Sequence, residues 1–258
     1  MQAIQVFRWR ARGIVAGRRA RAAALLLLSS MVTACATTRD FSSVSTLAKP
    51  APAATSQDTP SSAITLVLMP LDIELSVLTA GGVAQPNAAW TSAAKSHLVD
   101  ALRAAPALRG KRIQAYTAPA SSDPAGATID EIVHLHRAVG GAIMMHKLHV
   151  PLPTKQNRFD WSLGTGTAVL GRHARADYAL FIYVRDSYSS AGRILTQLAA
   201  VALGVLVEGG QQVGFASLVN LGSGDVVWFN FLASPTGDLR DAAGAAATVD
   251  RLLTGMPR

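Results

Sequence analysis

Residues 215–231 read FASLVNLGSGDVVWFNF. Two runs rich in β-branched and aromatic residues, 215–221 and 226–231, flank the turn residues Gly222-Ser223-Gly224-Asp225. Such runs around a short, glycine-containing turn are typical of a β-hairpin. We therefore expect an antiparallel pair of strands near the C-terminus.

The side chains of the second run are expected to divide between two faces, because successive side chains of a strand point in opposite directions. Val227, Phe229 and Phe231 share one face in this prediction. Trp228 and Asn230 share the other.

Further strands and helices are predicted upstream of the hairpin. Apolar runs bounded by turn residues favour strands, and they cover residues 64–69, 113–117 and 179–184. Helical periodicity and capping residues predict four helices. These run from Asn87 to just before Pro106, from a capping box at Thr128 to before Pro151, from about 163 to 173, and from Asp238, with Asp241 completing its cap, to before Pro257. Residues 186–192 are expected to form a polar break.

Strands that alternate with helices and end in a hairpin predict an α/β fold. We expect a mixed sheet of about five strands with a C-terminal antiparallel hairpin and helices packed on it. Gly140 and Gly141 fall in the middle of the second predicted helix. Because glycine weakens a helix, this pair predicts either a closely packed neighbour or a bend.

The N-terminus has the three parts of a secretory signal. Residues 1–34 hold six arginines and no acidic residue, followed by an apolar run over 22–31 and the small residues Thr33 and Ala34. The apolar run is well short of the ~20 residues that span a bilayer, so we expect a cleaved signal peptide rather than a membrane helix. Of 24 basic and 16 acidic residues, 18 and 16 remain from residue 35 onward. This balance does not predict nucleic-acid binding.

Val32-Thr33-Ala34-Cys35 resembles the lipobox of bacterial lipoproteins. The resemblance implies cleavage between Ala34 and Cys35 and a thioether-linked lipid on Cys35, carrying acyl chains such as palmitate. Cys35 is the only cysteine, so no disulfide is expected within the chain. Ala36 follows where an aspartate would favour the inner membrane, which implies the periplasm-facing leaflet of the outer membrane, with the inner membrane as the alternative.

Residues 35–62 are rich in Ser, Thr, Ala and Pro and show no apolar period. We expect them to form a flexible tether with the lipidated cysteine at its start. Residues 63–258 are then expected to form a single periplasmic α/β domain.

The order of the predicted elements and the hairpin over 218–228 resemble the periplasmic domains of outer-membrane assembly lipoproteins. This general arrangement of elements is shared by the curli secretion-channel lipoprotein, the penicillin-binding-protein activator lipoproteins and the N-terminal domain of TolB. Leu78-Thr79-Ala80-Gly81-Gly82 with Trp90, and Gly209-Gly210-Gln211-Gln212, are similar to segments of uncharacterised proteobacterial lipoproteins. The resemblance implies fold and compartment, and a fold alone does not assign a function.

Four histidines, at positions 134, 136, 146 and 149, invite a metal-site interpretation. His146 and His149 are one helical turn apart, whereas His134 and His136 point apart and lie about 15–18 Å away along the helix axis. One ion cannot use all four. We expect structural or surface roles and no metal site, the only candidates being His146 and His149.

Other possible chemical motifs have simpler interpretations. The sequence 164–167, Gly-Thr-Gly-Thr, lacks the rest of a phosphate loop and is expected to be a loop or helix start. Ser223 does not lie at a strand-turn-helix junction, so it does not match a nucleophile elbow. Asp72 and Glu74 are expected in a solvated loop.

Residues 194–207 are almost entirely apolar. They are too few to span a bilayer as a helix, and their length and position predict a helix buried against the sheet. The alternative is an exposed apolar face for self-association or membrane contact. The candidate interaction residues of such a face are Ile194, Leu198, Val201, Leu203, Val205 and Leu206.

None of these residues forms a motif that indicates a particular reaction. We therefore expect a non-enzymatic protein, anchored to the membrane by its lipid and carrying no other cofactor, that binds another envelope protein or itself. The alternative is a protein that binds a small ligand or metal through the histidine-rich helix over 134–149.

Overall fold

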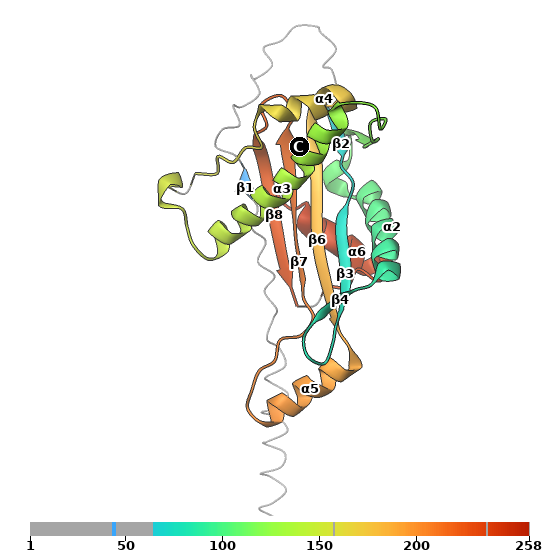
Figure 1. The fold of residues 1–258 in the computed structure, drawn as a ribbon, viewed down its shortest axis with the longest axis vertical. Coiled ribbons are helices and arrows are strands. Elements are labelled where there is room, and N and C mark those ends of the chain that lie inside the picture. Colours follow the sequence, from blue (N-terminus) through green and yellow to red (C-terminus); the bar gives the residue numbers. More distant parts are fainter. Residues whose placement is uncertain (1–42, 45–63, 157, 236, 258) are drawn as a thin grey trace, which may run out of the picture. The chain divides into compact units, whose positions relative to one another are not determined.

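The structure, a computed structural model, describes residues 43–44, 64–156, 158–235 and 237–257. The predicted signal peptide, Cys35 and most of the predicted tether lie outside these residues. One mixed sheet forms the centre of the described part, which confirms the predicted α/β class (Figure 1). Its strands are β1 (Ser43–Val44), β2 (Thr65–Leu68), β3 (Asp72–Leu78), β4 (Ala84–Pro86), β5 (Arg112–Ala115), β6 (Tyr178–Ser189), β7 (Gln212–Asn220) and β8 (Val226–Ser234).

Strand β6 is the central strand of the sheet. The order is β1-β8-β7-β6-β2-β5, and β3 pairs with β6 beyond the end of β2. The β2, β3, β5 and β6 pairings are parallel, whereas β6 with β7, β7 with β8, β8 with β1, and β3 with β4 are antiparallel. The C-terminal hairpin, β7 with β8, is therefore confirmed.

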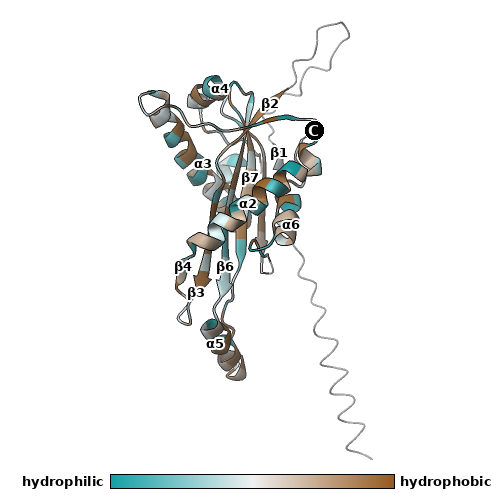
Figure 2. Ribbon diagram, turned by 90° about the vertical axis from the view of Figure 1, so that its right-hand side faces the viewer, coloured by the Kyte–Doolittle hydropathy of each residue, from teal (hydrophilic) through white to brown (hydrophobic). Residues whose placement is uncertain are grey.

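Helices cover both faces of the sheet (Figure 2). The α-helices are α2 (Ala88–Ala104), α3 (Ala125–Leu148), α4 (Ala168–Ala174), α5 (Ala191–Ala202) and α6 (Ala242–Leu252). Short 3-10 turns occur at Pro106–Leu108, Pro153–Lys155 and Thr165–Thr167. Helices α2 and α6 bury Leu98 and Val249 against one face, whereas α3 buries Ile143 against the other. Burial of each such side chain contributes about 1.5–3 kcal/mol to folding, so these two layers form the core.

Local sequence signals explain how α2 and α3 are built. The side chain of Asn87 accepts a hydrogen bond from the amide of Trp90 at 3.0 Å and caps α2, as predicted. In α3, a Cβ on Gly140 would lie 2.3 Å from the ring of Phe215, so this glycine allows the helix to approach the sheet. The close-packing interpretation is therefore confirmed for Gly140, whereas a Cβ on Gly141 would meet nothing within 4 Å.

Two helices begin elsewhere than predicted. Helix α3 begins at Ala125, three residues before Thr128, because the carboxylate of Asp123 accepts a hydrogen bond from the Ala125 amide and opens the first turn there. Helix α6 begins at Ala242 with Asp241 as its N-cap. Asp238 instead binds the guanidinium of Arg240, so the predicted helix start at Asp238 is wrong.

The predicted polar break at 186–192 is also wrong, since all of these residues except Ser190 lie in β6 or α5. Strand β6 continues to Ser189, because β3 pairs with it from Asp72 to Leu78 and β7 pairs with it up to Asp186. Both β3 and β4 were absent from the predicted sheet. The polar residues at this end are therefore strand residues whose backbones are paired.

A β-bulge changes the predicted faces of the hairpin. Leu218 pairs with Trp228 and Val219 pairs with Val226, so Val227 is an extra residue on β8. As a result, Val227 packs with Trp228 on the α2 and α6 side of the sheet and not with Phe229. The prediction that Val227 shares a face with Phe229 is wrong.

The predicted tether contains one paired segment. Ser43 and Val44 form β1, opposite Phe229 and Trp228 of β8. The expectation of a flexible tether over 35–62 is wrong for these two residues, because the edge of β8 offers backbone groups for pairing.

Candidate binding surfaces

The α5 segment, which we define as residues 191–207, is an exposed apolar surface. Helix α5 contains no buried residue. Seven of the fourteen exposed large apolar side chains among the described residues belong to the segment. They are Ile194, Leu195, Leu198, Val201, Leu203, Val205 and Leu206, and Leu206 is 91% exposed. The expectation that this helix is buried against the sheet is therefore wrong.

The position of α5 explains its exposure. It follows the last residues of β6 and lies beyond the ends of β3 and β6, where no sheet face is available to cover it (Figures 1 and 2). Its start touches the turn between β3 and β4, since a Cβ on Gly192 would lie 3.3 Å from Ala80. Val83 on the same turn is 64% exposed and adds to the apolar surface at this end.

Arg193 and Gln197, two of the three polar residues of α5, are bonded to backbone carbonyls, whereas the third, Thr196, is exposed. Arg193 donates to the carbonyl of Glu208 at 2.8 Å and to that of Ala80 at 3.4 Å. Gln197 donates to the carbonyl of Val207 at 3.3 Å. These hydrogen bonds hold Val207 and Glu208 against the helix, and the apolar side chains face away from them. No helix within the described ranges is long and apolar enough to cross a membrane.

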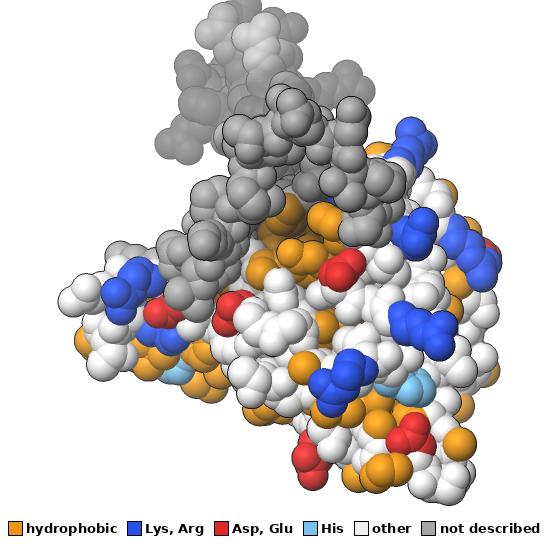
Figure 3. All heavy atoms as spheres, turned by 90° about the horizontal axis from the view of Figure 1, so that it is seen from above, with side chains coloured by type: hydrophobic (Ala, Val, Ile, Leu, Met, Phe, Trp, Pro, Cys, Tyr) orange, Lys and Arg blue, Asp and Glu red, His pale blue; other side chains and the backbone are white. Residues whose placement is uncertain are grey.

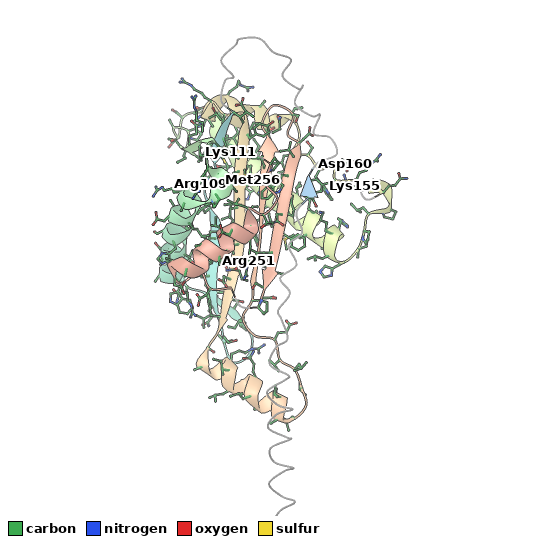
Figure 4. The ribbon with its side chains drawn as sticks, turned by 180° about the vertical axis from the view of Figure 1, so that it is seen from behind. Arg109, Lys111, Lys155, Asp160, Arg251 and Met256 are labelled. Atoms are coloured by element: carbon green, nitrogen blue, oxygen red, sulfur yellow. The ribbon has the colours of Figure 1, made fainter. Side chains whose placement is uncertain are left out.

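A second surface, which we call the basic hollow, has a volume of about 380 Å³. It lies between the C-terminal half of α3 and the chain over 151–161, and Ser43 of β1 also lines it. Figure 4 shows Lys155 and Asp160 on this loop. Aromatic and cationic side chains line it together: His146, Lys147, Lys155, Arg158, Phe159 and Trp161.

Cations outnumber acids in the hollow. The ammonium of Lys155 lies 2.6 Å from a carboxylate oxygen of Asp160 and 4.5 Å from the ring centre of Trp161. The hydrogen bond from Lys155 lowers the pKa of Asp160, so this carboxylate stays ionised. Lys147 lies 5.2 Å from the ring centre of Phe159, and burial lowers the pKa of its ammonium. With Arg158 as a third cation, the hollow is suited to an anion that also presents apolar surface.

The structure separates the four histidines as the spacing predicts. His136 is buried, donates or accepts one hydrogen bond with the hydroxyl of Ser217 at 2.6 Å, and stacks on Phe181 with ring centres 4.0 Å apart. Burial lowers the pKa of His136 to about 3, although the charge of Asp72 acts in the opposite direction. His136 is therefore a neutral core residue.

The other histidines lie at the surface. Nδ1 of His146 is bonded to the carbonyl of Val150 at 2.7 Å, and His149 is the exposed C-terminal cap of α3. His134 is also exposed. Among the residues that the structure describes, no three His, Cys, Asp or Glu side chains are grouped as a metal site.

The prediction of a solvated loop for Asp72 and Glu74 is wrong. Both lie in β3, where the pairing with β6 orders the backbone. The carboxylate of Asp72 forms ion pairs with Arg137 of α3 at 2.7 Å and with Arg185 of β6 at 2.8 Å. This carboxylate joins a helix to two strands and does not form an acid pair with Glu74.

A buried carboxylate at the end of β6 was not found from the sequence. One oxygen of Asp186 accepts hydrogen bonds from Tyr188 and Gln212, and from the Leu239 amide at 3.2 Å. Burial raises the pKa of Asp186 and also that of Tyr188. These contacts fasten the chain that leads into α6 to the sheet. In the sequence, only the two-residue spacing of Asp186 and Tyr188, which places both side chains on one face of a strand, indicated these contacts.

The glycine and serine motifs have the structural roles expected. Residues 164–167 open a short 3-10 turn that precedes α4, and the hydroxyl of Thr167 donates to the carbonyl of Gly164. Ser223 lies in the β7–β8 turn and its hydroxyl donates to Asp225 at 2.7 Å. Cys35 and Ala34, the predicted lipidation and cleavage positions, lie outside the described residues.

No family model matches the chain, and no curated protein sequence matches it. Among solved structures, it is similar to the PelC dodecamer from Paraburkholderia phytofirmans at 12% identity and a TM-score of 0.36, over 84% of this chain and 97% of that one. It is also similar to the LpoB C-terminal domain from Salmonella enterica at 16% identity and a TM-score of 0.23, over 66% of this chain and 82% of that domain. Scores of this size do not assign the chain to a family.

Proposed function

We propose that this protein is a lipid-anchored accessory protein of the outer membrane, facing the periplasm, which binds an acidic segment of another envelope protein in the basic hollow. The charge and lining of the hollow are the observation that carries this proposal. The anchor is supported by the Val32-Thr33-Ala34-Cys35 motif. No catalytic step is part of the proposal.

The chemistry of the hollow favours a carboxylate-bearing peptide segment. Lys147, Lys155 and Arg158 line the hollow, and the carboxylate of Asp160 pairs with only two of them, Lys155 and Arg158, so the hollow attracts negative charge. Trp161 supplies a flat apolar wall. A volume of about 380 Å³ is at the lower end of ligand pockets, which suits a few side chains of a peptide rather than a large cofactor.

A second candidate function is the binding of a small anion or a metal at the same place, because His146 lines the hollow. Its Nδ1 is already bonded to a backbone carbonyl, so Nε2 is the nitrogen left for a ligand. Titration of the protein with Zn²⁺, Cu²⁺ and citrate tests this function. Binding that a His146→Gln variant abolishes would favour the second candidate over the first.

Charge reversal tests the protein-binding function in envelopes. A photo-crosslinking residue is placed at Ser43, and the crosslinked product is compared between the otherwise unchanged protein and an Arg158→Glu variant. Arg158 is chosen because its side chain is 59% exposed and its ion pair with Asp160 is long, at 3.8 Å, so the change preserves the fold. Arg109→Glu is the matched control, since Arg109 is exposed and lies well away from Lys155 (Figure 4).

We expect a discrete product that Arg158→Glu removes and Arg109→Glu retains. A product that both variants retain would show that the partner does not use the charge of the hollow. The same crosslinked band in both variants would therefore contradict the proposed binding site.

A further inference from the structure

We propose that the α5 segment lies on the same lipid bilayer that holds Cys35 and forms a second membrane contact of the domain. The inference rests on the lipid anchor of the proposed function, and it is independent of the basic hollow. It commits the exposed apolar surface of residues 191–207 to lipid as its occupant. The argument comes from the direction of β1, from the orientation of the α5 side chains and from their charge.

The N-terminal end of β1 points toward the end of the sheet where α5 lies. Ser43 pairs with Phe229 and Val44 with Trp228 in antiparallel fashion, so the N-terminal end of β1 faces the Ser234 end of β8. Ser234 is paired with Gln212, and Gln212 with Asp186 near the end of β6, after which α5 begins. A chain that enters β1 without reversing therefore comes from the α5 end of the sheet.

The length of chain between the lipid and β1 sets how far the domain can stand from the bilayer. Eight residue steps separate Cys35 from Ser43, which span at most about 26–29 Å when fully extended. The five steps along β8 from Phe229 to Ser234 take up about 17 Å of this. About 10 Å remain beyond Ser234, which equals the three further steps of β6 from Asp186 to Ser189, after which α5 begins. The anchor therefore brings the bilayer within reach of α5.

Helix α5 has the reverse of the usual arrangement of apolar and polar side chains in water. In a surface helix of a domain in water, the apolar side chains face the core and the polar ones face the solvent. In α5 the polar Arg193 and Gln197 are bonded to backbone carbonyls of the domain, whereas Leu195 and Leu198 are 67% and 63% exposed. This orientation is the one expected for a helix whose outer surroundings are apolar.

The charge and extent of the apolar surface favour lipid over a protein partner. The only charged residue of the segment, Arg193, donates hydrogen bonds to the backbone carbonyls of Glu208 and Ala80. The outward surface of the segment therefore has no charged side chain that could pair with a specific residue of a protein partner. Within residues 191–208, the exposed polar side chains are Thr196 and Glu208. The twelve residues of α5 extend about 18 Å, so the helix lies along the membrane surface and does not cross it.

Fluorescence quenching from within the bilayer tests this arrangement on the lipidated protein. Cys35 is the only cysteine and is blocked by its lipid, so a new cysteine is the only free thiol. Leu198→Cys and Leu206→Cys carry an environment-sensitive fluorophore in the α5 segment. Arg172→Cys in α4 is the control, because α4 precedes β6 and α5 follows it, so the two lie at opposite ends of this strand (Figure 1). That opposite end carries Lys and Arg side chains spread over its surface (Figure 3).

The proteins are reconstituted in vesicles of phosphatidylethanolamine and phosphatidylglycerol, with and without a spin-label quencher on the acyl chains. An apolar helix face enters about 5–10 Å into the boundary of headgroups and acyl chains. We therefore expect roughly a two-fold loss of emission at both α5 positions and none at position 172, with little dependence on salt because the surface is uncharged.

Each other outcome overturns the inference in a recognisable way. Unquenched emission that shifts to the blue as protein concentration rises would mean that α5 binds a second copy. Unquenched emission typical of water would mean that α5 remains exposed. Mass spectrometry of the N-terminal peptide separates these results from a failure of the proposed function: without acyl chains on Cys35 both proposals fail, whereas an acylated protein with unquenched probes overturns only this inference.

Discussion

Acidification should destabilise the protein through one buried histidine. His136 is held neutral in the fold, where its pKa is lowered from 6.5 to about 3 by burial. A base whose pKa is lower in the folded state binds fewer protons than it does when unfolded. Its contribution to stability is therefore present above pH 6.5 and is lost progressively as the pH falls toward 3. At pH 5 the unfolded chain protonates this imidazole and the folded chain does not, which costs about 2 kcal/mol relative to pH 7.5.

Urea unfolding at pH 7.5 and pH 5.0 measures this contribution on the chain from residue 35 onward, with Cys35→Ser to omit the lipid. His136→Gln removes the titrating group and should remove about 2 kcal/mol of the pH dependence, although it lowers stability at both pH values. His134→Gln is the matched control, because His134 is exposed on the same helix. Equal pH dependence in the two variants would refute the assignment of a neutral, buried imidazole at position 136.

Two further predictions compare neighbouring or similar residues. Gly140→Ala should destabilise by about 1–3 kcal/mol, because its Cβ would collide with Phe215, whereas Gly141→Ala meets nothing within 4 Å and should stabilise by about 1 kcal/mol; thermal unfolding of both variants checks the sign of each change. Asp72→Asn breaks two ion pairs with partly buried partners and should cost about 1 kcal/mol, whereas Asp100→Asn breaks one exposed pair and should cost at most about 0.5 kcal/mol. Equal urea midpoints for these two variants would contradict a role of Asp72 in joining α3 to the sheet.

The strands that the sequence predicts are those whose patterns are set by local residues. The hairpin has a turn that only a few residue types allow, and the apolar runs over 66–69 and 179–184, which mark β2 and β6, have no polar interruption. Strand β3 was missed because Asp72, Glu74 and Ser76 give it a polar half, although Ile73 and Leu75 alternate with them as in a half-buried strand. The end of β6 was missed for the same reason, since Asp186 is accommodated by partners distant in sequence.

The candidate surfaces depend on tertiary position, which periodicity does not encode. The apolar residues of α5 have the spacing of a core helix, and only the place of α5 beyond the sheet leaves them exposed. For the basic hollow, Lys155, Arg158 and Trp161 are close in sequence, but their convergence on α3 requires the loop after Pro151 to fold back. The histidine cluster in the sequence lies on α3, which does line the hollow, but it suggested a metal site and not an anion site.

Ser43 links the two proposals physically. It pairs with β8, lines the basic hollow and is separated from Cys35 by only seven residues. In the proposed arrangement, a partner segment in the hollow lies next to the chain that leads to the lipid, and Cys35 lies at most about 26–29 Å from Ser43. A long tether over residues 35–62 would have allowed a partner far from the membrane. In the proposed arrangement, the pairing of β1 favours a partner whose acidic segment lies within about 26–29 Å of the bilayer, with α5 limiting how the domain turns on its anchor.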